Sequence, residues 1–284
     1  MAIRRISSIG RPLGLKYPTN RTIIFILVSF FILGSITKLV VGDSFLDSMV
    51  WAFRAAAALF FAWALAREID PDGNASAFIA TALIFVALFF VDLPALLPLF
   101  WVLLIMRILN RITGLVPKPL DLAGILILAG VLSWQELWVY GLMTAPALYI
   151  NYRMDGKKKK GIILAVTVMS FVVLSAFVGN ATFTSIQISV LAIIAVTILI
   201  LLFIPIIFIV TKVKSLTDVT GEPVSVVRLN VTRAVVLVMG ILVTIIQGDT
   251  GFYNLLPLWA AIGGIIGWNY YELVKNYVKQ RISY

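Results

Sequence analysis

The chain has 284 residues, of which 61% are hydrophobic and 13% are charged, and its formal net charge is +10. Soluble domains are nearer half apolar and a quarter charged, so a water-soluble fold of this size has no means of covering so much apolar surface. The composition predicts a membrane protein whose positive charge meets anionic lipid headgroups rather than nucleic acid.

The sequence contains no cysteine and no histidine. This excludes disulfides, thiolate nucleophiles, histidine metal sites and histidine proton relays. Any chemistry would have to use carboxylates, Lys, Arg, Tyr, Ser or Thr. There is also no Walker A motif and no dinucleotide-binding motif, and we expect no resident cofactor or metal ion.

Ten apolar runs follow a basic, irregular segment, residues 1–21, which has no signal-peptide cleavage site. A helix needs about 20 apolar residues to cross a bilayer, and fewer where the bilayer is thin. The sequence therefore predicts an all-α, polytopic transmembrane bundle over residues 22–271, followed by an amphipathic cytoplasmic tail over residues 272–284. The expected spans are 22–41, 45–66, 75–91, 94–109, 120–134, 137–152, 161–178, 186–211, 232–247 and 252–271.

The segments 120–134 and 137–152 are short for crossings. They fit either two tilted spans or one re-entrant pair.

Every second connection between the apolar runs is basic. If successive runs cross the membrane in alternating directions, all but two of the 23 Lys and Arg residues fall on one side of the membrane. The exceptions, Lys38 and Arg54, lie within expected spans. Because cytoplasmic loops carry such an excess, about ten crossings put both termini in the cytoplasm and make the chain a multi-pass protein of the cell membrane.

Arg54 is the most informative single residue, because it lies near the middle of the second expected span. An ionised side chain at that depth costs roughly 2.5–3.5 kcal/mol, so we expect Arg54 to face the bundle interior or water and to have a partner. Asp47 lies two turns back on the same helix face, and Asp92 and Glu136 lie in the same outer half. These four residues suit the site of a permease for a small anionic solute. The alternatives are a structural ion pair or an arginine that reaches toward the outer surface.

The topology itself offers a comparison. Ten crossings with both ends inside, with Arg54 in the second span and Pro98 in the fourth, are similar to the general plan of the drug/metabolite transporter superfamily. The similarity is one of topology and covers no specific motif; it implies a permease that works by alternating access.

A second polar group is expected at the cytoplasmic surface, between the second and third spans and after the fourth. A hairpin of spans three and four across Asp92 and Pro94 would bring the two parts together. The group, which we call the cytoplasmic polar cluster, consists of Arg67, Glu68, Asp70, Asp72, Arg107, Asn110 and Arg111.

This cytoplasmic polar cluster has two interpretations. Asp70 and Asp72 would hold Mg²⁺ while Arg107 and Arg111 grip a phosphate, which suits a membrane enzyme acting on a phosphate-bearing lipid. Alternatively, the acidic loop is an ordinary turn that caps the third span, and its ion pairs latch the helices together.

Small residues support a third function. The alanines at 55–58, and Gly263 with Gly267 in a G-x-x-x-G arrangement, allow close helix packing within the bundle or with another chain. A non-catalytic subunit of a membrane complex would use such faces. The expected partners are therefore the bilayer with its anionic headgroups, a small-molecule substrate, or another membrane protein.

Overall fold

The computed structural model describes residues 7–135, 138–178, 187–209 and 211–282. Helices make up 78% of it and these ranges contain no β-strand, so the all-α expectation is confirmed. The helices in these ranges are α2 (Pro18–Val41), α3 (Phe45–Ile69), α4 (Asn74–Ala87), α5 (Leu96–Asn110), α6 (Pro119–Trp134), α7 (Trp138–Met154), α8 (Lys158–Val178), α9 (Val190–Ile209), α10 (Val226–Asn254) and α11 (Leu256–Ile282).

Each apolar run expected from the sequence coincides with one of these helices. Among the described residues, four helices (α2, α3, α9 and α10) are long and apolar enough to cross a membrane, which indicates a membrane protein. The region 120–152 forms two helices, α6 and α7. The largest differences from the expected bounds are in α10, which continues past a kink at Gly248, and in α11, which continues through the tail to Ile282.

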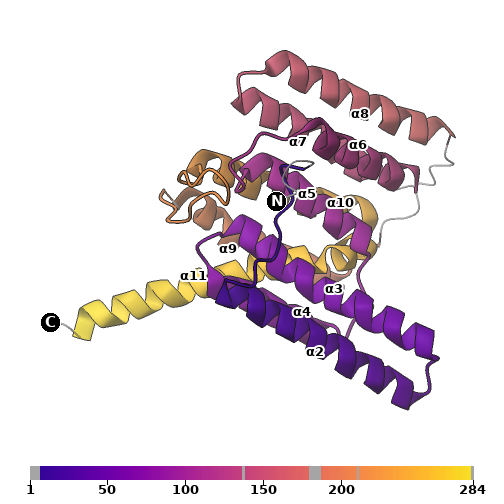
Figure 1. Ribbon diagram of the computed structural model, residues 1–284, viewed down its shortest axis with the longest axis vertical. Coiled ribbons are helices and arrows are strands. Elements are labelled where there is room, and N and C mark those ends of the chain that lie inside the picture. The colour runs from indigo at the N-terminus through magenta and orange to yellow at the C-terminus, as the bar shows by residue number, and fades with distance from the viewer. Residues whose placement is uncertain (1–6, 136–137, 179–186, 210, 283–284) are drawn as a thin grey trace.

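Local signals in the sequence place the first helix boundaries. α2 begins at Pro18, whose fixed φ suits the first helical position, and it ends at Val41, just before Gly42, whose φ of 107° is left-handed. α3 follows Ser44, whose hydroxyl accepts a hydrogen bond from the Asp47 N–H. α2 and α3 consequently form a hairpin at one edge of the bundle (Figure 1).

The helices pack around α3, α5 and α10. α3 packs against α2, α4, α5 and α11, whereas α5 packs against α3, α6, α7 and α10. α6, α7 and α8 lie side by side on the flank opposite α2 (Figure 1). The expected hairpin of spans three and four is wrong, because α4 packs against α11 and α3 rather than against α5.

Gly264 explains why α4 packs against α11. A Cβ at Gly264 would lie 2.5 Å from the Ser76 carbonyl oxygen and 2.8 Å from the Ala80 nitrogen, both in α4. Gly263 has only ordinary contacts, and Gly267 has no neighbour within 4 Å. The close approach therefore depends on the glycine between the two that the sequence pattern singled out.

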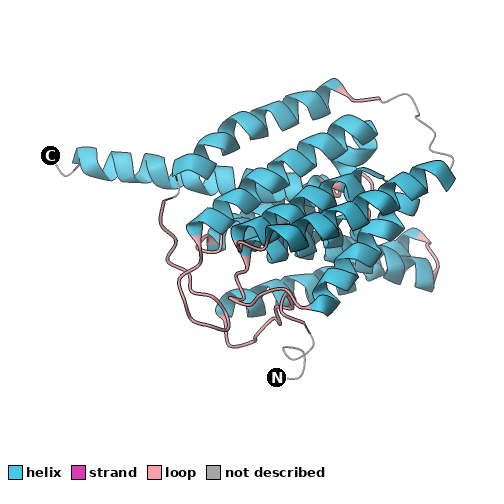
Figure 2. Ribbon diagram, turned by 90° about the horizontal axis from the view of Figure 1, so that it is seen from above, coloured by secondary structure: helices cyan, strands magenta, loops and turns pink. Residues whose placement is uncertain are grey.

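The basic connections, which the sequence predicts on one side of the membrane, gather at one end of the bundle. The segment 7–17, the α3–α4 turn, and the α5–α6, α7–α8 and α9–α10 connections exchange hydrogen bonds there. We call this the basic end. Figure 2 shows the helices running side by side, with the long loops at this end and α11 projecting beyond it.

Candidate functional site

Glu68, in the last turn of α3, is the centre of the polar groups at the basic end. It is 1% exposed. Its Oε1 accepts hydrogen bonds from Arg11 at 2.9 Å and from Arg107 Nε at 3.0 Å, and its Oε2 accepts from Asn110 Nδ2 at 2.9 Å. Because all three donors reach the carboxylate, the cost of burying its charge is largely offset. The structure thus brings together three residues of the cytoplasmic polar cluster: Glu68, Arg107 and Asn110.

The segment before α2 crosses the basic end and is fixed at two points. Ser8 donates from its backbone N–H and its hydroxyl to Asp121 in the first turn of α6. Arg11 donates to Glu68 and, at 2.7 Å, to Asp218 in the α9–α10 connection. Burial lowers the pKa of Arg11, but the two carboxylates outweigh burial and raise it above its ordinary value. Arg11 therefore stays charged at any physiological pH.

Asp70 and Asp72, which the sequence suggests as a pair of metal ligands, have separate partners. The Asp72 carboxylate accepts hydrogen bonds from the backbone N–H groups of Lys214 and Ser215, both at 2.8 Å, and from the Ser215 hydroxyl. Asp70 accepts a hydrogen bond from the Ser76 hydroxyl at 3.3 Å, within the α3–α4 turn. Over the described ranges, no group of three or more Asp or Glu residues is arranged to hold a metal ion.

The two aspartates also differ in electrostatics. Burial raises the pKa of Asp70 above its ordinary value, although the Arg233 guanidinium opposes the shift. Burial likewise raises the pKa of Asp72, but the hydrogen bonds from Lys214 and Ser215 outweigh it and hold the pKa below its usual range. Asp72 therefore acts as an ionised latch between the α3–α4 turn and the α9–α10 connection.

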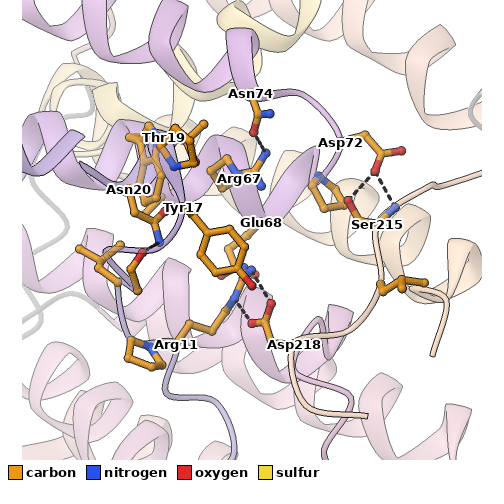
Figure 3. A pocket seen from close by; sticks show the side chains of 18 of the residues that line it. Arg11, Tyr17, Thr19, Asn20, Arg67, Glu68, Asp72, Asn74, Ser215 and Asp218 are labelled. Carbon is orange, nitrogen blue, oxygen red and sulfur yellow. Dashed lines mark hydrogen bonds and ion pairs between the residues drawn. The ribbon is translucent and has the colours of Figure 1, made fainter. Parts of the chain in front are cut away.

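A pocket of about 790 Å³ lies beside Glu68 and is the candidate binding site. It is formed by residues 11–14 and 17–20, the last three turns of α3, the α3–α4 turn, Arg107 and the first part of the α9–α10 connection. Figure 3 shows Arg67 and Glu68 from α3, Tyr17 from just before α2, and Asp218 and Ser215 from the α9–α10 connection around this opening. We call it the basic pocket.

Two cations of the basic pocket, Arg67 and Lys214, form no direct ion pair with a described carboxylate, although Asp72 interacts with both at longer range. Arg11 and Arg107 are paired with Glu68. In contrast, Arg67 donates only to the Asn74 side-chain oxygen, at 2.8 Å, and neither Arg67 nor Lys214 forms an ion pair with any described residue. The pocket therefore has positive charge available to a ligand.

The deeper wall of the basic pocket is apolar and carries one unmatched donor. Phe60, Trp63 and Ala64 line it. Trp63 is 6% exposed, and its indole N–H has no hydrogen-bond partner in the part of the chain that the structure describes. Phe60 is seven residues before Arg67, which is about 10 Å along the helix. The pocket thus extends from charged loops to an aromatic wall two helical turns deeper.

Arg111 does not join Glu68. It ends α5 in the left-handed conformation, with a φ of 51°, and its guanidinium turns to the α7–α8 connection. There it donates to both oxygens of Asp155 and, at 2.9 Å, to the Asn151 Oδ1. Arg107 and Arg111 therefore have different partners, because the left-handed residue at the helix end directs the second arginine to Asp155 rather than to Glu68.

Arg54 lies on the outer surface of the bundle and not in its interior, which corrects the expectation from the sequence. It is exposed and forms no hydrogen bond or ion pair with any described residue. The buried face of α3 at this level consists of Ala52, Ala55, Ala56 and Leu59, which have helical spacing. Arg54 lies off that face, so the packing of the alanines turns it outward.

The other residues of the expected permease site do not gather around Arg54. Asp47 is exposed and accepts a hydrogen bond from the Ser44 hydroxyl at 2.6 Å at the start of α3. Asp92 is exposed between α4 and α5 and forms no ion pair with a described residue. Glu136 lies outside the described residues. Neither Asp47 nor Asp92 lines the basic pocket.

Four contributors at the basic end were not predicted from the sequence: Arg11, Asp155, Asp218 and the backbone of Lys214. The acidic residues of the basic loops were the available signal, because a carboxylate among many cations is a natural partner for a buried arginine.

No protein-family model, curated protein or solved structure matches this chain.

Proposed function

We propose that the chain is a cell-membrane protein of about ten crossings, with the basic end in the cytoplasm, and that it binds a phosphate-bearing amphiphile in the basic pocket. The gathering of alternate connections at one end supports the crossings. The excess of Lys and Arg in those connections supports a cytoplasmic basic end, and hence cytoplasmic termini.

The observation that carries the binding function is the shape and charge of the basic pocket. Arg67 and Lys214, which form no direct ion pair with a described residue, leave the lining with four cations against three carboxylates, and Phe60 and Trp63 form an apolar wall two turns deeper along α3. In the proposed orientation that wall lies inside the bilayer. A ligand with an anionic head and an apolar tail matches both parts, and arginine binds phosphate through two parallel hydrogen bonds.

Binding is better supported than a reaction in this pocket. Two residues of the expected enzyme site, Asp72 and Arg107, line the pocket. The Asp72 carboxylate already accepts three hydrogen bonds from the α9–α10 connection, and Arg107 is paired with Glu68. A permease with its solute site at Arg54 would need another protein element to cover the exposed face of α3, so that the site is enclosed. A role as a non-catalytic subunit of a membrane complex is compatible with lipid binding, because neither function requires the bundle to change its structure.

The test is lipid binding by the purified full-length chain, measured by native mass spectrometry. Phosphatidic acid is the probe, and diacylglycerol is the matched lipid without the phosphate. We expect phosphatidic acid to bind and diacylglycerol not to bind. Arg67→Gln should weaken binding about tenfold or more, because a hydrogen bond to a charged group contributes about 1.5–3 kcal/mol.

The control is Arg153→Gln, which removes an exposed arginine of the basic end that does not line the pocket. Its binding should match the unmodified chain. An equal loss in both variants would show diffuse attraction to the basic surface, and equal binding of diacylglycerol would show that the phosphate is not recognised. Either result rejects the proposal.

A further inference from the structure

A second polar cluster at the basic end lies outside the basic pocket and has no part in the proposed function. Asp155, after α7, is held by two guanidinium groups: Arg111 binds both of its oxygens, and Arg228 of α10 binds Oδ1. The Asn151 Oδ1 accepts hydrogen bonds from the same two arginines, at 2.9 and 3.3 Å. These four residues form what we call the arginine-pair cluster.

The arginine-pair cluster carries more positive than negative charge in a sheltered place. The side chains of Arg111, Arg228 and Asp155 are only 11–14% exposed, and Asn151 is fully buried. Two guanidiniums face a single carboxylate, so one positive charge is uncompensated. Burying an unbalanced charge is costly, and a protein normally supplies a counter-charge.

The hydrogen-bonding groups left over in this cluster are donors. The Nε of Arg111 and the Nδ2 of Asn151 are buried and have no partner among the described residues. The amide of Asn151 cannot be turned round, since its oxygen already faces two cations. The neighbouring Tyr152 hydroxyl is also buried without a partner, and the Lys160 ammonium lies 5.1 Å from the centre of its ring.

We propose that the arginine-pair cluster binds a halide ion, which in the cell is chloride. A halide supplies the missing negative charge and accepts hydrogen bonds without bringing hydrogens of its own. A water molecule brings two hydrogens, and the carboxylate and amide oxygens of the cluster are already engaged by the guanidiniums. The left-handed backbone of Arg111 is consistent with such a site, because strained residues persist where the surroundings fix them.

The test uses the full-length chain in lipid nanodiscs, with chloride exchanged for gluconate at constant ionic strength. A ligand that binds only the folded state raises the melting temperature by mass action, by about 2–4 °C for each tenfold increase above the dissociation constant. We expect bromide to replace chloride. We also expect a bromide-soaked crystal to show anomalous density beside Arg111 Nε and Asn151 Nδ2.

Asn151→Asp should abolish the chloride dependence, because the new carboxylate supplies the missing charge and removes an unmatched donor. Arg67→Gln in the basic pocket is the control and should keep the full chloride response. No chloride response, or density at the cluster without anomalous signal, would identify water and overturn the proposal. If Asn151→Asp does not fold, the bromide crystal of the unmodified chain decides alone.

Discussion

Glu68 and Arg54 are charged residues of the same helix, α3, but they differ in burial and in the number of their hydrogen-bond partners. Glu68 is 1% exposed and accepts hydrogen bonds from three side chains contributed by two other segments. Arg54 is exposed and has no partner among the described residues. The comparison shows that the charge of Glu68 is buried where neighbouring segments supply hydrogen-bond donors, whereas Arg54 lies off the packed face of α3, where no described side chain reaches it.

The alanine face of α3 explains why the two residues differ. Ala52, Ala55 and Ala56 allow other helices to come close, which leaves no room for a long side chain on that side. Near the end of α3, the segment 7–17 and α5 surround Glu68 with arginines. The same helix thus carries a packing face at one level and a polar centre at another.

The largest effect is expected from removing the centre of this arrangement. Glu68→Ala leaves Arg11 and Arg107 without their shared carboxylate, and breaking such a buried ion pair costs about 3–5 kcal/mol. The measurement is the free energy of unfolding in detergent micelles. Glu272→Ala is the matched control: Glu272 pairs with Lys275 on the surface of α11 and should contribute less than about 1 kcal/mol. Similar losses in the two variants would contradict the role of Glu68.

A smaller loss is expected from closing the contact between α4 and α11. Gly264→Ala places a Cβ 2.5 Å from the Ser76 carbonyl oxygen, so the helices must move apart. Overpacking of this kind costs typically about 1–3 kcal/mol in unfolding free energy. Gly267→Ala is the control, since nothing lies within 4 Å, and should be neutral or slightly stabilising. The reverse order would mean that the G-x-x-x-G pair makes the contact after all.

Asp70 and Asp72 should respond to pH with opposite signs. The folded state depresses the pKa of Asp72, so its stabilising effect is present above the unfolded pKa of about 3.9 and is lost as the pH falls through the folded value. The folded state raises the pKa of Asp70, so stability falls as the pH rises from the unfolded to the folded value.

The measurement is unfolding free energy against pH in two variants. Asp72→Asn should lose stability at neutral pH and show a flatter acid limb than the unmodified chain. Asp70→Asn should be neutral or more stable at pH 7. Stability losses of the same sign in both variants at pH 7 would show that the two carboxylates act as one pair.

The smallest loss of stability is expected at Arg54. Arg54→Leu removes an exposed charge that has no partner among the described residues, and an ionised side chain at this depth is itself costly, so the unfolding free energy in detergent should not fall. The affinity of the basic pocket for phosphatidic acid should be unchanged. A tenfold loss of binding would show that Arg54 contributes to the binding site and would contradict its placement outside the basic pocket.

Many residues of the candidate site could be identified from the sequence, but which of them contact one another could not. The i, i+3 spacing of Arg107 and Asn110 correctly indicates one helix face, and both reach Glu68. Arg111 fits the same spacing but leaves the helix in a left-handed conformation and binds Asp155. Helical periodicity holds only while the backbone stays helical, so the last residue of a pattern is the least secure.

The sequence by itself determined the ten apolar helices and the side of the membrane on which the cations are predicted to lie. Both follow from local properties, namely the length of an apolar run and the charge of the loop after it. Only the tertiary structure decided that α4 packs against α11, that Arg54 faces outward, and that Arg11 and Asp218 close the basic pocket. The reason is that partners for buried charges, and the close approach of backbones at Gly264, come from segments far apart in the chain.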